Sequence, residues 1–203
     1  MRFRISTQEV EILTFNNENA YNMELQEGLE VATFAGGCFW CTEAVFLELK
    51  GVHSVVSGYI GGEVENPSYA AICKGDTGHA EAIRITFDSN VISFGTLLEL
   101  FFATHDPTTL NRQGNDVGTQ YRSEIFYHSQ FQKELSQAYM DLLTQEKVFD
   151  KPIVTKLSAV SKFYEAEEYH QNYYNQNKLQ GYCSYVITPK IDKLHKVFQE
   201  LLK

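Results

Sequence analysis

The sequence predicts an α+β fold, a two-layer α/β sandwich with a split βαβ core. Three observations predict it. Apolar residues recur with strand and helix periods in the order strand, helix, strand, strand, helix, strand between residues 31 and 128. A chain of 203 residues that is 43% hydrophobic can bury a core without disulfides or metals. The 13% share of aromatic residues argues against disorder.

Local signals mark the elements of this core. Strict alternation places Glu81, Ile83 and Ile85 on one face of a strand, and Ser93 has the position of a helix N-cap. The expected elements are a strand at 31–35, a helix at 38–50, a strand at 52–59, a loop-rich segment at 62–77, a strand at 79–87, a helix after Ser93 and a strand at 121–128. This order is typical of a ferredoxin-like core.

Extensions flank the core on both sides. The C-terminal extension is expected to contain a helix at 129–147, a strand at 153–160, a helix at 164–175, a strand at 182–188 and a helix at 191–202. Residues 1–30 carry six glutamates against two arginines and show no steady period, which indicates an acidic N-terminal arm. We therefore expect one domain over residues 31–203, preceded by this arm.

Composition excludes several classes of function. A net charge of −9 and a pI near 5.1 argue against binding to nucleic acid or an anionic membrane. The sequence has neither an apolar run of bilayer length nor a signal peptide, so a cytoplasmic monomer is expected. In a reducing compartment, four cysteines are expected to be reactive, metal-bound or buried. Because C-x-x-C occurs once, without a second such pair, a zinc site is not expected.

Cys38 is the first candidate for chemistry. It follows Gly36-Gly37, where a strand ends and a helix begins. Unpaired N–H groups and the positive end of the helix dipole stabilise a thiolate there, so the pKa of Cys38 is expected to lie below that of a free thiol. The alternative is a buried, inert cysteine that packs as a small hydrophobic residue.

The string around Cys38, GGCFWC (36–41), resembles the signature of the peptide methionine sulfoxide reductase A family. Four further segments match that family in the same order: GYIGGEVENPSY (58–69), CKGDTGHAEA (73–82), HDPTT (105–109) and RQGNDVGTQYRS (112–123). The resemblance covers about residues 31–185. It implies that residues 31–203 form a catalytic domain that reduces methionine S-sulfoxide, free or in oxidised proteins, and so repairs those proteins.

The resemblance also implies the course of the reaction. Cys38 attacks the sulfoxide sulfur, methionine leaves, and a sulfenic acid remains on Cys38. A second cysteine condenses with the sulfenic acid to a disulfide, which thioredoxin or another dithiol reduces. No metal and no organic cofactor are implied.

Several residues take roles from the same match. A sulfoxide oxygen needs a proton in order to leave, and a desolvated carboxyl has a raised pKa, so Glu81 is assigned as the proton donor. A surface Glu81, or one paired with Arg84, is the alternative. The remaining assignments are Tyr69 and Tyr121 as donors to the sulfoxide oxygen, Asp116 as a residue that positions neighbouring groups, and Phe39 and Trp40 as an apolar wall for the S-methyl group.

Two cysteines are candidates for resolving the sulfenic acid. Cys41 is preferred, since it lies three residues after Cys38 and closes a very small loop. A disulfide there would require the helical turn to unwind. Cys183 is the alternative, because GYC (181–183) matches a tail cysteine of some relatives, although its surroundings predict a strand.

Two other functions stay open at the level of sequence. A thioredoxin-like disulfide oxidoreductase would use C-x-x-C at a strand–helix junction. It leaves Glu81 and the loops around Tyr69 and Asp116 unexplained. A non-enzymatic thiol redox sensor would oxidise Cys38 slowly and would not turn over.

Overall fold

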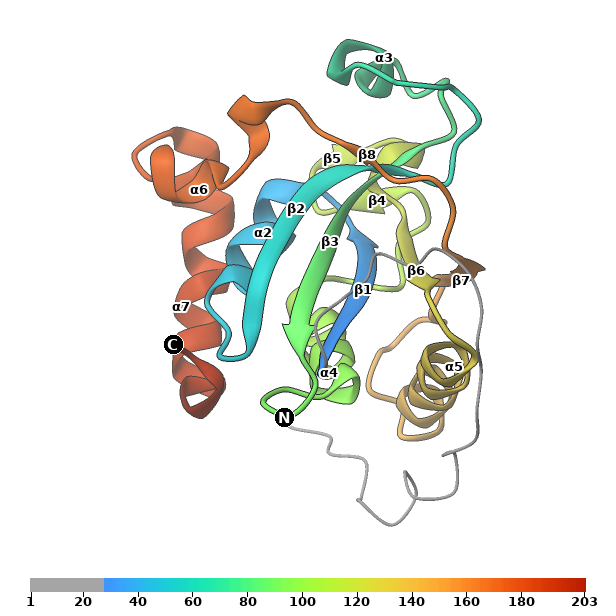
Figure 1. Ribbon diagram of the computed structural model, residues 1–203, viewed down its shortest axis with the longest axis vertical. Coiled ribbons are helices and arrows are strands. Elements are labelled where there is room, and N and C mark those ends of the chain that lie inside the picture. Colours follow the sequence, from blue (N-terminus) through green and yellow to red (C-terminus); the bar gives the residue numbers. More distant parts are fainter. Residues whose placement is uncertain (1–27) are drawn as a thin grey trace.

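The computed structural model describes residues 28–203, and the 1–30 arm lies almost entirely outside them. A six-stranded sheet with the order β7-β6-β1-β3-β2-β8 runs through the molecule (Figure 1). Its strands are β1 (Leu29–Gly36), β2 (Val52–Ile60), β3 (Ala80–Asp88), β6 (Ser123–Tyr127), β7 (Lys156–Ala159) and β8 (Tyr164–Glu165). All pairs are antiparallel except β6 with β7.

Helices flank this sheet. They are α2 (Phe39–Leu47), α3 (Tyr69–Lys74), α4 (Phe94–Thr104), α5 (Gln130–Gln145), α6 (Tyr173–Gln176) and α7 (Thr188–Val197). Contacts link α7 to α2, α2 to α4 and α4 to α5, and these four helices share the main core with Phe34, Ile83 and Ile85 of the sheet. The fold is thus a mixed α/β fold with a mostly antiparallel sheet. None of the helices within residues 28–203 could span a membrane.

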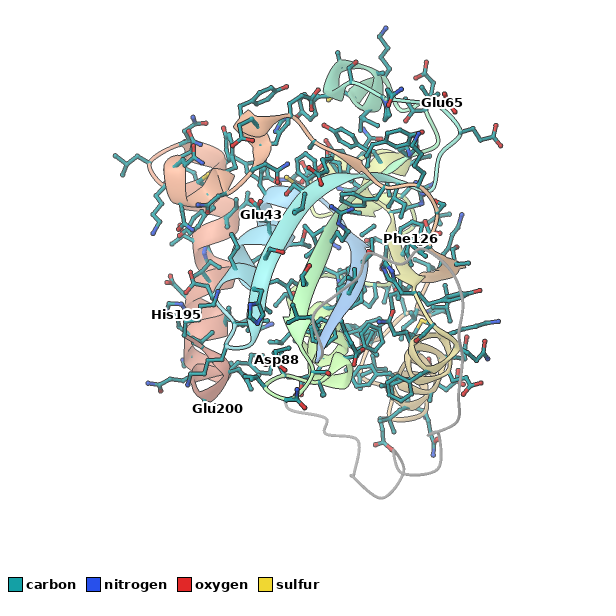
Figure 2. The ribbon with its side chains drawn as sticks, in the orientation of Figure 1. Glu43, Glu65, Asp88, Phe126, His195 and Glu200 are labelled. Atoms are coloured by element: carbon teal, nitrogen blue, oxygen red, sulfur yellow. The ribbon has the colours of Figure 1, made fainter. Side chains whose placement is uncertain are left out.

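Alternation along β3 separates two faces of the sheet. Ile83 and Ile85 belong to the main core, whereas Ala80 and Ala82 belong to a smaller cluster. That cluster also contains Phe126, which is labelled in Figure 2. Glu81 is two residues before Ile83 in the strand, so its side chain lies on the same face, toward the main core. The sequence pattern predicted this face correctly.

Serine caps begin three of the helices, and the cap at Ser93 was predicted from the sequence. The side chain of Ser93 accepts a hydrogen bond from the Thr96 N–H, and that of Ser129 accepts one from the Gln132 N–H. Ser68 caps α3 in the same way, inside the segment that was expected to be loop-rich.

Two expectations for the C-terminal extension are wrong. Residues 164–175 do not form one helix, because Tyr164–Glu165 pairs with the edge of β2 and only Tyr173–Gln176 is α-helical. Residues 182–188 do not form a strand; Cys183–Ile187 is a π-helical turn that leads into α7. Cys183, Ile187, Ile191 and Leu194 are all buried at helical spacing, so burial of this face overrides local β-propensity.

Candidate active site

Cys38 lies at the junction of β1 and α2, as expected. Gly37 turns the chain with φ +92°, and a Cβ there would lie 2.5 Å from the Gln113 side chain, so the turn requires glycine. Cys38 itself is the N-cap residue of α2 and is 8% exposed. The thiol is therefore held at a rigid strand–helix junction, with little contact with water.

Glu81 reaches this junction from β3. Its Oε2 atom accepts the main-chain N–H of Phe39 at 3.1 Å, and the side chain is 2% exposed. Burial raises the pKa of Glu81 to about 8, although the hydrogen bond from Phe39 opposes the shift. The Glu81 carboxyl therefore holds its proton at neutral pH, and it is hydrogen-bonded to the main chain of Phe39, the residue after Cys38.

The two sulfurs at the start of α2 form a coupled pair. Burial, a hydrogen bond with Cys41 and the charge of Glu81 raise the pKa of Cys38 well above its ordinary value. The hydrogen bond with Cys38 lowers the pKa of Cys41 to about 7. The expectation that the pKa of Cys38 lies below that of a free thiol is thus wrong for the resting protein, because burial outweighs the effect of the helix end.

Tyr182 joins the sulfur pair to Asp116. Its hydroxyl lies 3.6 Å from the Cys41 Sγ atom and donates a hydrogen bond to Asp116 Oδ2 at 2.8 Å. Asp116 begins the short strand β5 (Asp116–Val117), which pairs with β4 (Arg112–Gln113). Tyr182 was not predicted as a site residue, because its surroundings predict a strand.

Tyr69 and Tyr121 approach the same centre from two loops. Tyr121 ends a short 3₁₀ turn (Thr119–Tyr121), and burial followed by the charges of Glu81 and Cys38 raises its pKa. Tyr69 begins α3, and burial, a hydrogen bond with Cys73 and the charge of Glu81 raise its pKa. Both phenols are therefore neutral hydrogen-bond donors close to Glu81.

Aromatic rings form one wall beside Cys38. Phe39 is buried, while Trp40 stacks on Tyr173 with centroids 3.7 Å apart and planes 6° apart. The Trp40 indole N–H donates to His170 Nδ1 at 3.1 Å, and the His170 ring lies 4.3 Å from that of Tyr69. His170 and Tyr173 were also missed, since both fall in the segment that was expected to be a helix.

Glu43 and Glu167 hold the segment that carries these rings. The Glu43 carboxylate accepts the main-chain N–H groups of Asn172 and Tyr173 at 2.8 and 3.2 Å. Glu167 accepts the Tyr69 N–H and the Tyr59 hydroxyl, both at 2.9 Å. The sequence offered no signal for either glutamate, because each partner is distant along the chain.

Cys183 lies deeper than the sulfur pair. It is fully buried in the main core, and burial followed by the charge of Cys41 raises its pKa. All four cysteines are free thiols, and Cys73 is exposed. Cys183 therefore lies near Cys41, but a bond to Cys38 would require the π-helical turn to move.

Two buried histidines, His79 and His105, make structural hydrogen bonds. His79 Nδ1 accepts the Gly62 N–H and its Nε2 lies 2.8 Å from the Val64 carbonyl oxygen. His105 bridges the Phe101 carbonyl and the Ser123 hydroxyl, and burial lowers its pKa to about 4. Within residues 28–203, no cluster of His, Cys, Asp or Glu is arranged to hold a metal ion.

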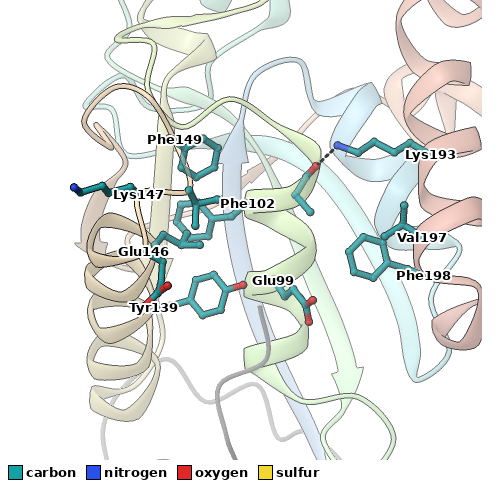
Figure 3. A pocket seen from close by; sticks show the side chains of 12 residues that line it. Glu99, Phe102, Tyr139, Glu146, Lys147, Phe149, Lys193, Val197 and Phe198 are labelled. Atoms are coloured by element: carbon teal, nitrogen blue, oxygen red, sulfur yellow. Dashed lines mark hydrogen bonds between the residues drawn. The ribbon is translucent and has the colours of Figure 1, made fainter. Parts of the chain in front are cut away.

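A separate cavity of about 410 Å³ lies between α4, α5 and α7 (Figure 3). Phe102, Tyr139 and Phe198 line it, and Lys193 closes one side by donating a hydrogen bond to the Ala103 carbonyl. None of the candidate site residues borders this cavity.

Comparisons with known proteins agree with this site. The model of the family described as "Peptide methionine sulfoxide reductase" matches residues 30–202. The "Peptide methionine sulfoxide reductase MsrA" of Deinococcus radiodurans is 58% identical over 86% of this chain and 84% of that protein, and the one of Chromobacterium violaceum is 52% identical over 86% and 99%.

Solved structures are similar over most of the chain. Reduced Mxr1 from Saccharomyces cerevisiae has a TM-score of 0.69 at 36% identity, covering 77% of this chain and 90% of that one. Methionine sulfoxide reductase A of Corynebacterium diphtheriae has a TM-score of 0.68 at 34% identity, covering 79% and 80%. With a buried thiol pair, a neutral carboxyl and this match over nearly all described residues, the chain belongs to the peptide methionine sulfoxide reductase family.

Proposed function

We propose that this chain reduces methionine S-sulfoxide, in peptides or free, to methionine, with Cys38 as nucleophile and Glu81 as proton donor. One observation carries the proposal: the protonated Glu81 carboxyl is tied to the N–H of Phe39, directly after Cys38. A sulfoxide whose sulfur faces Cys38 would have its oxygen within the reach of that acid. Tyr69 and Tyr121 would donate to the same oxygen without adding charge.

The reaction balances without any outside oxidant. The Cys38 sulfur would form a bond to the sulfoxide sulfur while Glu81 protonates the oxygen, which leaves as water. Water then attacks the Cys38 sulfur, the bond between the two sulfurs breaks with its electron pair on methionine, and Cys38 is left as a sulfenic acid. The Cys41 sulfur then attacks the Cys38 sulfur, the sulfenic oxygen leaves as water, and the disulfide forms.

Cys41 is the proposed resolving residue, with Cys183 as the alternative. Support comes from the contact between the two sulfurs in the resting protein, which shortens the path to a bond. The buried position of Cys183 on a helical turn disfavours direct attack on Cys38. Thioredoxin or a similar dithiol would reduce the disulfide by thiol exchange.

Further proposals concern the domain organisation of the chain, its oligomeric state and its location in the cell. We propose a single catalytic domain over residues 31–203 that acts as a cytoplasmic monomer without a metal or organic cofactor. We also propose that the four central strands form a ferredoxin-like core. Their antiparallel order β6-β1-β3-β2, with α2 after the first strand and α4 after the third, supports a split βαβ arrangement.

A chiral assay tests the function. The reduced protein is incubated with a peptide containing both methionine sulfoxide epimers and dithiothreitol, and the epimers are separated by chiral chromatography. The proposal expects loss of the S epimer alone, and no loss with Cys38→Ser. If neither epimer is consumed by the wild-type protein, the thiol-sensor function takes its place.

A further inference from the structure

His170 is a buried histidine for which the proposed reaction has no use. It ends the short turn Glu168–His170 and is 1% exposed. Its ring lies among aromatic rings of the site, with centroids 5.2 Å from Phe39, 5.5 Å from Trp40 and 4.3 Å from Tyr69. A titratable ring is therefore enclosed within the apolar wall beside Cys38.

The hydrogen bond from Trp40 fixes the form of this ring. An indole N–H can only donate, so the His170 Nδ1 atom, 3.1 Å away, must be an acceptor without a proton. A neutral ring then carries its proton on Nε2. That atom is buried and has no hydrogen-bond partner among the residues that the structure describes. Burial also lowers the pKa of His170, which keeps the ring neutral at pH 7.

An unpaired buried donor costs free energy, so the favourable polar contact of this ring is the one made by Nδ1. Trp40 already stacks face to face on Tyr173. Stacking fixes the plane of the indole but lets it rotate and slide within that plane. The bond to Nδ1 removes this freedom and sets which edge of the indole faces the neighbourhood of Cys38.

The partner segment is itself anchored to α2. Glu43, one helical turn after Trp40, binds the N–H groups of Asn172 and Tyr173. The bonds from Trp40 to His170 and from Glu43 to Asn172 and Tyr173 close a ring between α2 and this segment. The position of His170 relative to Trp40 is thereby determined by the fold.

We propose that His170 is a positioning residue for the reductase reaction: its unprotonated Nδ1 atom holds the Trp40 indole in the orientation that receives the S-methyl group of the substrate. The proposal rests on the proposed function. It assigns His170 no contact with the reacting atoms and no proton transfer. The expected consequence is an effect on substrate binding rather than on the chemical step.

Two substitutions distinguish the effect of the Nδ1 acceptor from the effect of the aromatic ring. In His170→Asn the amide oxygen can take the place of Nδ1, and the orphaned Nε2–H is lost. In His170→Phe an aromatic ring remains, but neither nitrogen does. We expect His170→Asn to keep KM for an S-sulfoxide peptide within about threefold of wild type. We expect His170→Phe to raise KM about tenfold, equivalent to about 1.4 kcal/mol, with kcat changed less than about twofold.

Fluorescence gives a readout that a merely structural role would not produce. Trp40 is the sole tryptophan of the chain, so its emission reports this hydrogen bond directly. His170→Phe should shift the emission, and His170→Asn should leave it near that of wild type. Since His170→Phe also removes an unpaired donor, its unfolding temperature should stay within about 3 °C of wild type. His53→Asn, on an exposed position of β2, is the matched control and should change nothing.

The outcomes are distinct. A wild-type KM for His170→Phe overturns the proposal, as does an equal rise in KM for both variants, because the acceptor would then not be the determinant. If both the unfolding temperature and kcat of His170→Phe fall, the residue has a purely structural role, and this result also overturns the proposal. Absence of S-epimer reduction by the wild-type protein defeats the proposed function instead, while the emission shift of His170→Phe would still report the bond to Trp40.

Discussion

The Glu81 carboxyl and the Phe39 main-chain N–H are 3.1 Å apart, which joins β3 to the first turn of α2. It places a carboxyl whose pKa is raised to about 8 next to the residue that follows the proposed nucleophile, Cys38. In the proposed reaction, this arrangement supplies a proton to the substrate.

Glu81→Gln tests the acid directly. Glutamine keeps an acceptor for the Phe39 N–H but cannot release a proton, so kcat should fall about 100-fold. Wild-type kcat should decline as pH rises through about 8, where Glu81 loses its proton. The kcat of Glu81→Gln should not show this decline. Glu65→Gln, at an exposed position, is the control and should retain full activity. A wild-type pH profile in Glu81→Gln would contradict the assignment.

The same carboxyl should make stability depend on pH. Its pKa rises from 4.5 in the unfolded chain to about 8 in the native protein, so the native state binds the extra proton between these values. Stability should therefore fall as pH rises from 4.5 to 8. The difference in unfolding temperature between Glu81→Gln and wild type should grow over that window in favour of the variant. A difference that is constant with pH would refute the linkage.

The resolving cysteine can be identified after one turnover without reductant. If Cys41 resolves, a non-reducing tryptic digest should contain the bridge within the peptide at 5–50, which holds both Cys38 and Cys41. A bridge to Cys183 would join that peptide to the one at 179–190. With thioredoxin as the reductant, Cys41→Ser should release one equivalent of methionine and then stop turning over. Cys183→Ser should keep turning over under the same conditions.

Tyr182→Phe should weaken the acidity of the sulfur pair. The Tyr182 hydroxyl contacts Cys41 and helps to lower its pKa, after the larger effect of Cys38. Without that hydroxyl, alkylation of Cys41 by iodoacetamide at pH 7 should slow about two- to threefold, because less thiolate is present. Tyr185→Phe is the matched control, since Tyr185 is 86% exposed on the same helical turn. Equal rates in both variants would exclude this role.

Glu43→Ala should destabilise the protein. Removing the buried carboxylate leaves the N–H groups of Asn172 and Tyr173 without their acceptor, which should cost about 2–3 kcal/mol. For a chain of this size that corresponds to about 4–12 °C in unfolding temperature by calorimetry. Glu43→Gln keeps one acceptor oxygen and should lose less. An unchanged unfolding temperature in Glu43→Ala would show that water replaces the carboxylate.

Sequence patterns predicted the elements whose signals are local. The alternation of Glu81, Ile83 and Ile85 gave the correct face of β3, and Ser93 and Ser129 marked the true starts of α4 and α5. The position of Cys38 at a strand–helix junction was also predicted.

The predictions that failed concern features that depend on contacts between distant segments of the chain. The 164–175 region has helical composition, but pairing of Tyr164 with Tyr59 and capture of Asn172 by Glu43 override it. Tyr182 and His170 became visible as site residues only through partners 141 and 130 residues away. The acidity of Cys38 was misjudged because burial, which the local sequence does not reveal, raises the pKa of this thiol more than the helix end can lower it.

The most direct test of the account is a single turnover of Cys41→Ser with a methionine S-sulfoxide peptide and no reductant. The account predicts one equivalent of methionine per protein and a sulfenic acid on Cys38, trapped by dimedone and located by mass spectrometry. It also predicts that introducing Glu81→Gln slows this step without changing the trapped residue. Methionine formed without an adduct on Cys38, or formed equally fast by Cys38→Ser, would contradict the account.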